Sequence, residues 1–150
     1  MDALGKLYNS TTIVTMNAGG KMNGIAVAWI TRVSINPPMI AISIGKARYS
    51  HKLLNETDKF GVCIMEKSAK EIVVLFGTKS GRNYDKFAGI DYSLSKNDVP
   101  ILPGTLAYIE CQIKSKADAG DHTIFIGEVI DQKVFKDEAP MLYGEHRILL

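Results

Sequence analysis

Hydrophobic residues gather along the chain in short β-branched runs separated by turn residues, a pattern typical of an antiparallel β protein. Residues 107–114 alternate apolar and polar side chains, which predicts a half-buried strand. Residues 39–44 are almost wholly apolar, which predicts a strand buried on both faces. A glycine inside a β-rich run, Gly127, marks an expected bulge or close backbone approach. The predicted strands are 12–16, 24–33, 39–44, 60–65, 107–114 and 123–130, with short additions at 134–135 and 146–150.

Two helices interrupt the strands. The first is expected to run from Ser50 to about residue 56. The second has Ser68 at its N-cap and Glu71 three residues later, which matches a capping box, and Gly77 is expected to end it. Its apolar face is Ala69, Ile72, Val73 and Phe76, at helical spacing. Helices placed late and singly do not make a βαβ series, so the predicted class is mainly β: an antiparallel barrel with helical insertions.

Composition narrows the classes of function. At 150 residues the chain is expected to form one domain, and its 46% hydrophobic and 23% charged residues are near the averages for globular proteins. A formal net charge of +2 is too small to indicate a nucleic-acid partner. No run approaches the ~18 apolar residues of a membrane span, and residues 1–6 do not resemble a secretory signal, so we expect a cytoplasmic protein without a membrane partner.

Few residues are suited to metal or thiol chemistry. His51, His122 and His146 are isolated from one another and form no ligand pair, so no metal site is expected. Cys63 and Cys111 are expected to be two buried thiols, with a disulfide as the less favoured alternative.

Three segments carry candidate chemistry. In residues 23–38 small side chains alternate along a strand, which would let a flat group lie close to the backbone, and hydroxyls follow; the alternative is a core strand meeting a rigid turn. In residues 45–51 two cations precede a helix, which favours an anion; the alternative is a solvated basic loop. Residues 77–87 place Arg82 and Lys86 after a helix end, where they could hold a phosphate; the alternative is an ordinary polar connection. Together they indicate a phosphorylated ligand with a flat ring, which Trp29 and Tyr49 are placed to flank.

These segments, with residues 120–129 (GDHTIFIGEV), resemble the flavin reductase-like, FMN-binding split-barrel family, in order and over nearly the whole chain. The resemblance implies a six-stranded antiparallel Greek-key barrel that binds FMN at the interface of a homodimer. It also implies that His122 lies near the reactive face of the flavin, where nicotinamide stacks. The flavin-contacting positions that it implies are Ala28, Trp29, Ile30, Thr31, Ser34, Gly45, Lys46, Tyr49, Ser50, Ser80, Gly81, Arg82, Lys86 and Phe87.

The implied function is an FMN-dependent oxidoreductase. It would pass electrons from NAD(P)H through bound FMN to free flavin, a ferric chelate or a partner protein. Residues 46–51 look more like the flavoredoxin and ferric-reductase branch than the reductase partners of monooxygenases. The alternatives are a non-enzymatic, FMN-binding electron-transfer protein without a nicotinamide site, and a barrel that only binds a ligand or partner.

Overall fold

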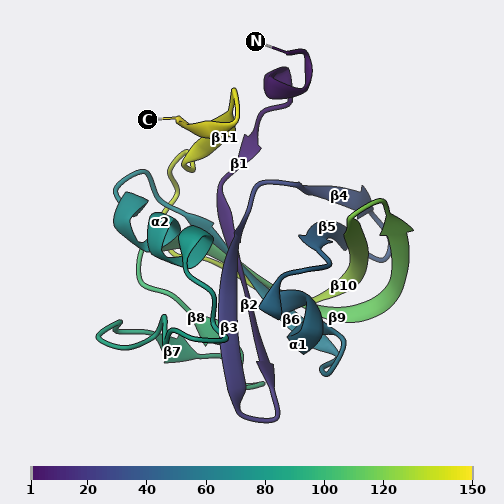
Figure 1. Cartoon of the computed structure of the whole chain (residues 1–150), viewed down its shortest axis with the longest axis vertical. Helices are drawn as coiled ribbons and strands as arrows, with labels where there is room; N and C mark the ends of the chain where they lie inside the picture. Colours follow the sequence, from purple (N-terminus) through teal and green to yellow (C-terminus); the bar gives the residue numbers. More distant parts are fainter. Residues whose placement is uncertain (1, 150) are drawn as a thin grey trace.

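The computed structural model describes residues 2–149 as a mainly β protein with two short α-helices (Figure 1). The helices are α1 (Tyr49–Leu54) and α2 (Lys70–Thr78), and a 3-10 turn, η1 (Leu4–Lys6), lies near the N-terminus. The strands are β1 (Asn9–Ser10), β2 (Thr12–Ala18), β3 (Lys21–Val27), β4 (Ile30–Ser34), β5 (Met39–Gly45), β6 (Lys59–Met65), β7 (Ser93–Leu94), β8 (Pro100–Ile101), β9 (Thr105–Ala119), β10 (His122–Val134), β11 (Leu142–Gly144) and β12 (Arg147–Leu149).

Seven strands form one antiparallel sheet in the order β3-β2-β6-β9-β10-β5-β4, which confirms the predicted class. The expected count of six strands is wrong, because the predicted strand 24–33 is two strands, β3 and β4. The backbone turns between them, where the amide of Ile30 donates to the carbonyl of Ala28 at 3.1 Å.

The sheet is curled into a split barrel. β3 and β4 are its opposite edges, yet only Ala28 and Trp29 lie between them along the chain. Three Cα steps cannot span more than about 11 Å, so the two edges must come close together at this point. The barrel is therefore split at this point, between β3 and β4.

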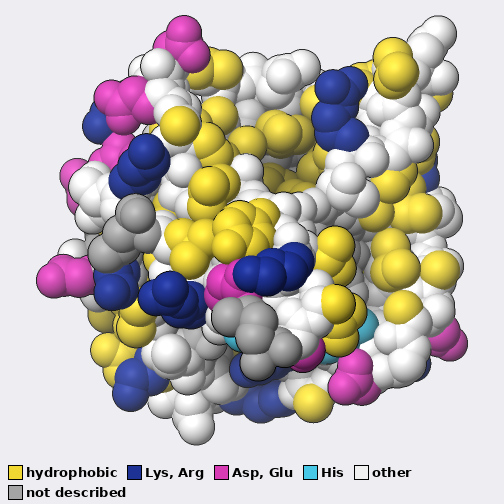
Figure 2. Space-filling view, turned by 90° about the horizontal axis from the view of Figure 1, so that it is seen from above, with side chains coloured by type: hydrophobic (Ala, Val, Ile, Leu, Met, Phe, Trp, Pro, Cys, Tyr) yellow, Lys and Arg dark blue, Asp and Glu magenta, His cyan; other side chains and the backbone are white. Residues whose placement is uncertain are grey.

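A second, small sheet joins the two ends of the chain in the order β1-β11-β12. Figure 1 shows it at one end of the molecule, above β4 and α2. Figure 2 looks onto this end, where hydrophobic side chains line a hollow. Within residues 2–149 no helix is long and apolar enough to cross a membrane.

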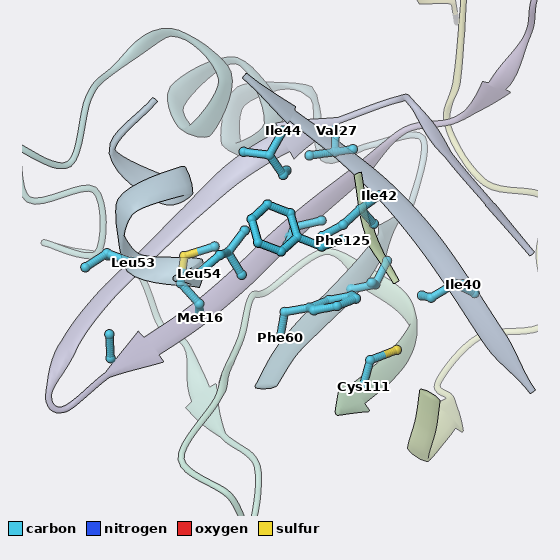
Figure 3. Packing of buried hydrophobic residues seen from close by; sticks show 13 residues of the cluster. Met16, Val27, Ile40, Ile42, Ile44, Leu53, Leu54, Phe60, Cys111 and Phe125 are labelled. Atoms are coloured by element: carbon cyan, nitrogen blue, oxygen red, sulfur yellow. The ribbon is translucent and has the colours of Figure 1, made fainter. Parts of the chain in front are cut away.

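The barrel interior is filled by aromatic and branched side chains, among them Phe60, Phe125 and Ile42 (Figure 3). The strands buried on both faces are β2, from residue 12 to 16, and most of β6. For β5 the prediction was wrong: Ile40, Ile42 and Ile44 are buried, but the residues between them are half-exposed, because the outer face of β5 is not covered.

A second hydrophobic cluster lies between α2 and the outer face of β2 and β6. The predicted apolar face of α2 is confirmed, with Val73 and Phe76 buried in this cluster. The predicted capping box is wrong: Ala69 is the N-cap, and the Ser68 hydroxyl donates to the Glu66 carboxylate at 2.7 Å instead. The helix also runs one residue past Gly77.

The remaining local predictions concern Gly127 and the end of the chain, and they agree with the structure. The β9–β10 pairing shifts register at Gly127, and a Cβ there would lie 2.6 Å from the Cβ of Cys111, so both the bulge and the close approach are confirmed. Residue 134 ends β10, and β12 covers most of the predicted segment 146–150, whose last residue lies outside the described part.

Candidate functional site

An apolar cavity of about 410 Å³ lies at the split of the barrel, and we call it the ring cavity. The ends of β3 and β5 form one side of it, and α2 forms another. The terminal hairpin, β11–β12, supplies a further wall through Tyr143 and Ile148. Its lining is Thr11, Ile25, Ala26, Val27, Ala28, Trp29, Ser43, Ile44, Gly45, Arg48, Val73, Val74, Gly77, Thr78, His122, Tyr143 and Ile148.

A smaller cavity of about 140 Å³ adjoins it, and we call it the cationic cavity. The two cavities share Ile25, Arg48 and Gly77 in their linings, so they lie side by side. Four cationic side chains and two serines face the smaller one. Its lining is Asn23, Ile25, Ala47, Arg48, Tyr49, Ser50, Phe76, Gly77, Lys79, Ser80, Gly81, Arg82 and Lys86.

Tertiary contacts bring the two basic loops together here, although they are some thirty residues apart in the sequence. The guanidinium of Arg82 donates to the carbonyl of Ala47 at 3.2 Å and lies over the ring of Tyr49, 5.7 Å from its centroid. Below them, the buried Asn23 amide donates to the Ser50 hydroxyl at 2.8 Å. Since α1 has only six residues, the side-chain cations rather than its dipole give this cavity its positive charge.

Lys86 anchors the second loop from inside the protein. Its ammonium donates to the carbonyls of Gly24 at 2.7 Å and Phe76 at 3.1 Å. Burial, with the nearby charge of Arg48, lowers the pKa of Lys86 to about 8. The side chain is therefore a cation at neutral pH that is easily discharged, and a bound anion would stabilise its charged form.

Trp29 and His122 form the outer rim of the ring cavity. The Trp29 side chain is 59% exposed, and its ring lies 4.9 Å from that of His122. The Trp29 carbonyl accepts a hydrogen bond from the Ser43 amide, so its backbone is fixed while its ring stands in solvent. An exposed tryptophan beside a cavity is a surface suited to stacking on a flat ligand.

His122 has a carboxylate partner. Its Nδ1 lies 2.7 Å from the Asp121 carboxylate, and this hydrogen bond lowers the pKa of Asp121. Because a carboxylate accepts, Nδ1 carries the proton and Nε2 is left without this partner. This pairing with Asp121 is compatible with a place on the cavity rim.

A third cavity, of about 460 Å³, lies on the other side of Trp29 against the outer face of β4 and β5. Ile30 and Thr31 line it together with Ala41 and Ser43, and it shares Trp29, Ser43 and Tyr143 with the ring cavity.

Most of the predicted residues line one of these cavities. The ring cavity is lined by Ala28, Trp29, Gly45 and His122, and the third cavity is lined by Ile30 and Thr31. The cationic cavity is lined by Tyr49, Ser50, Ser80, Gly81, Arg82 and Lys86.

Three predicted residues line none of these cavities. Ser34 ends β4, and Lys46 pairs with Asp118 at 3.2 Å. Phe87 is buried in the second hydrophobic cluster, edge-on to Phe76. Gly24 packs against the core, because a Cβ there would lie 2.9 Å from the Phe76 ring. At this position the Phe76 ring occupies the space in which the sequence analysis expected a flat ligand.

The sequence analysis did not predict several other residues that line the cavities. Arg48 faces both cavities and belongs to a loop that had been noticed for its two cations. Asn23 positions Ser50 from a neighbouring strand, and Val73 and Tyr143 come from elements whose approach to the site has no local signal.

Among residues 2–149 the two cysteines line none of the three cavities. Cys63 and Cys111 are buried free thiols, as predicted, and burial raises the pKa of Cys111 to about 12, so it stays protonated at neutral pH. No three His, Cys, Asp or Glu side chains of this part of the chain gather as a metal site would require.

Comparison with known proteins identifies the family. The model of the flavin reductase like domain matches residues 4–148, and the chain belongs to this family. It is 37% identical, over 95% of its length, to a high molecular weight rubredoxin of Moorella thermoacetica, of which it spans only 63%. It is 28% identical to a ferric-chelate reductase (NAD(P)H) of Archaeoglobus fulgidus over 99% of this chain and 89% of that one. The solved NADH:FAD oxidoreductase SgcE6 of Streptomyces globisporus superimposes with a TM-score of 0.90 at 29% identity, over 97% and 87% of the two chains.

Proposed function

We propose that this protein is a flavin-dependent oxidoreductase that binds FMN in the ring and cationic cavities. The observation that carries the proposal is that an apolar cavity of about 410 Å³ lies directly beside a cationic one of about 140 Å³. A flavin mononucleotide has the same division, with a flat, mostly apolar ring at one end and a phosphate dianion at the other. Bound there, the flavin would supply the redox chemistry, accepting a hydride and giving up electrons.

FMN fits this donor set better than FAD. The cationic cavity has room for about one phosphate group, and Arg82 offers a planar guanidinium that suits two phosphate oxygens. Arg48 and Lys86 add charge at its inner side. In this arrangement a second phosphate and an adenosine would lie outside the cavity.

Each remaining group has a role that follows from its position. Trp29 and Tyr143 limit the ring cavity on its outer side, and the split strands offer backbone groups to the ring edge. His122 lines the ring cavity beside Trp29, where it would orient a nicotinamide or stabilise negative charge on a reduced ring.

The donor that we propose is NAD(P)H, and the acceptor is free flavin, a ferric chelate or a partner protein. The names of the ferric-chelate reductase (NAD(P)H) and of the NADH:FAD oxidoreductase support this assignment. A second candidate is a non-enzymatic electron-transfer domain, which the likeness to part of a longer rubredoxin favours.

One experiment separates these functions. The purified protein, loaded with FMN, is mixed anaerobically with NADH or NADPH while flavin absorbance is followed. Rapid bleaching by either nucleotide is the expected result. Absence of bleaching, with electron exchange to a partner protein, would support the carrier, and failure to take up FMN would overturn both.

We also propose that the protein is a homodimer whose interface includes the outer face of β4, β5 and β10. Half-exposed Ala41 and Ile124 lie on that face, Val33 of β4 is 49% exposed, and Ile35, in the turn that follows β4, is 83% exposed. Exposed apolar side chains beside a cofactor site are typical of a subunit interface.

A cytoplasmic location stays a prediction from the sequence.

A further inference from the structure

The wall of the ring cavity formed by the terminal hairpin, residues 142–149, is attached differently from the other walls. β11 pairs with β12 and with β1, and neither strand of the hairpin pairs with a strand of the seven-stranded sheet. Up to Met141 the chain is fixed, since this residue is buried and its amide donates to Met65. Beyond it, Tyr143 and Ile148 reach the ring cavity from an element outside the barrel.

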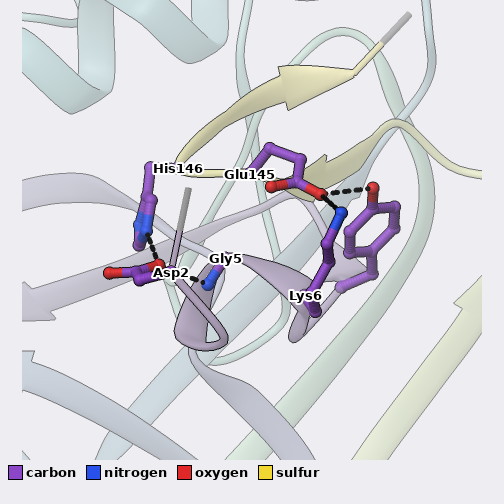
Figure 4. A network of polar contacts seen from close by, with 6 residues as sticks. Asp2, Gly5, Lys6, Glu145 and His146 are labelled. Atoms are coloured by element: carbon purple, nitrogen blue, oxygen red, sulfur yellow. Dashed lines mark hydrogen bonds and ion pairs between the residues drawn. The ribbon is translucent and has the colours of Figure 1, made fainter.

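What holds the tip of the hairpin is a set of polar contacts to the N-terminal segment, which we call the terminal clamp: Asp2, Gly5, Lys6, Glu145 and His146 (Figure 4). The Lys6 ammonium pairs with the Glu145 carboxylate, and His146 lies 2.8 Å from the Asp2 carboxylate. The amide of Glu145 donates to the carbonyl of Gly5 at 2.7 Å.

The turn of the hairpin depends on this clamp. Glu145 and His146 both have left-handed backbone conformations, with φ of 52° and 59°. Residues with side chains adopt that conformation at a cost, and glycine or asparagine usually occupies such a turn. The clamp contacts offset the cost, so their loss would favour movement of the hairpin away from the N-terminal segment.

We propose that the terminal hairpin is a gate for flavin entry and release, held shut by the terminal clamp. The walls formed by β3 and β5 are hydrogen-bonded into the main sheet, and α2 is packed against the second cluster. Among the described residues, the hairpin is a cavity wall that lies outside the main sheet and is held at its tip by polar contacts between side chains. The gate rests on the proposed function, because it assumes that flavin occupies the ring cavity.

A reversible covalent staple tests the gate directly. A Cβ on Gly5 would lie 3.3 Å from the Cα of Glu145, so the double variant Gly5→Cys/Glu145→Cys brings two thiols within bonding range. Exchange of bound FMN for isotopically labelled FMN is then followed by rapid filtration, without any electron donor. We expect the oxidised variant to exchange at least about tenfold more slowly than the same protein after reduction.

A second variant opens the gate instead. Lys6→Met keeps the aliphatic stem but removes the ion pair, and we expect FMN exchange to quicken about two- to fivefold, as suits an exposed pair. The matched control is Lys136→Met, which removes an ion pair of 2.7 Å to Glu66, a residue that lines none of the cavities. The control should exchange FMN at the unaltered rate.

The outcomes are distinct. FMN exchange that is equal in the oxidised and reduced staple, or equal in Lys6→Met and Lys136→Met, overturns the gate while leaving flavin binding intact. A protein that takes up no FMN overturns the proposed function and the gate together.

Discussion

Arg82 connects the two basic loops, and we expect it to recognise the phosphate of the flavin. Arg82→Ala should weaken FMN binding by about 10- to 100-fold, the size of a charge-assisted hydrogen bond, and should change riboflavin binding much less. Fluorescence titration with both ligands measures the difference. Arg32→Ala, an exposed arginine on β4 that lines none of the cavities, is the control. Equal losses for FMN and riboflavin would mean that Arg82 acts only by tying its loop to Ala47.

Lys86 should make FMN binding sensitive to pH. Its pKa of about 8 in the folded protein leaves the cation intact at pH 7 and removes it above pH 8, so affinity for FMN should fall between pH 8 and 9.5. Riboflavin affinity should stay level over that range, and Lys86→Met should abolish the pH dependence. A fall of equal size for riboflavin would contradict the assignment.

Lys86 should also make stability depend on pH, but in the opposite direction to FMN affinity. Between about pH 8 and its ordinary value of 10.5, the unfolded chain keeps a proton that folded Lys86 has lost. The contribution of Lys86 to the free energy of unfolding should therefore rise with pH in this window, because the unfolded state binds more protons. Denaturant unfolding of the flavin-free protein, compared with Lys86→Met, measures this contribution.

His122 should act on electron transfer rather than on flavin binding. Its ring stands at the rim of the cavity and is oriented by Asp121, so His122→Ala should slow flavin reduction by NAD(P)H while FMN affinity and Tm stay nearly unchanged. Stopped-flow reduction, FMN titration and thermal melting report the three quantities. If reduction keeps its full rate and Tm falls by several degrees, His122 only holds the turn.

At the scale of elements, α2 is placed by the contact of Phe76 with Gly24 of β3. A Cβ at Gly24 would lie 2.9 Å from the Phe76 ring, so Gly24→Ala should lower the free energy of unfolding by about 1–3 kcal/mol through overpacking. Gly24→Ala/Phe76→Leu should recover part of that loss, since the smaller side chain makes room. Denaturant unfolding of both variants tests the coupling; a double variant less stable than either single one would contradict it.

At the scale of the whole molecule, the uncovered apolar face of β4, β5 and β10 should mediate self-association. Ile35→Glu places a charge at an 83% exposed apolar residue in the turn that follows β4, and it should shift the protein from dimer to monomer. Sedimentation velocity of the FMN-loaded protein and its variant measures this. A monomeric unaltered protein that holds FMN tightly would contradict the proposed interface.

Local patterns in the sequence determined which segments are strands and where the cationic groups lie. The alternation of residues 107–114 and the glycine at 127 report on their own strand, because side chains of a strand point alternately to its two faces. Such patterns fail where a competing contact is equally local, as at Ser68, whose hydroxyl binds Glu66 rather than the helix. They also fail at Trp29, where one apolar run is divided between two edges of a sheet.

The tertiary structure alone decided how these pieces become a site. The curl of the sheet brings the loops of Ala47 and Arg82 together, and long-range packing adds α2 and the terminal hairpin as cavity walls. Packing likewise sends Phe87 into the core and gives Lys86 its lowered pKa, although both sit in one polar-looking segment. The physical reason is that burial and desolvation depend on which distant segments meet, whereas periodicity records only the direction in which each side chain points along its own element.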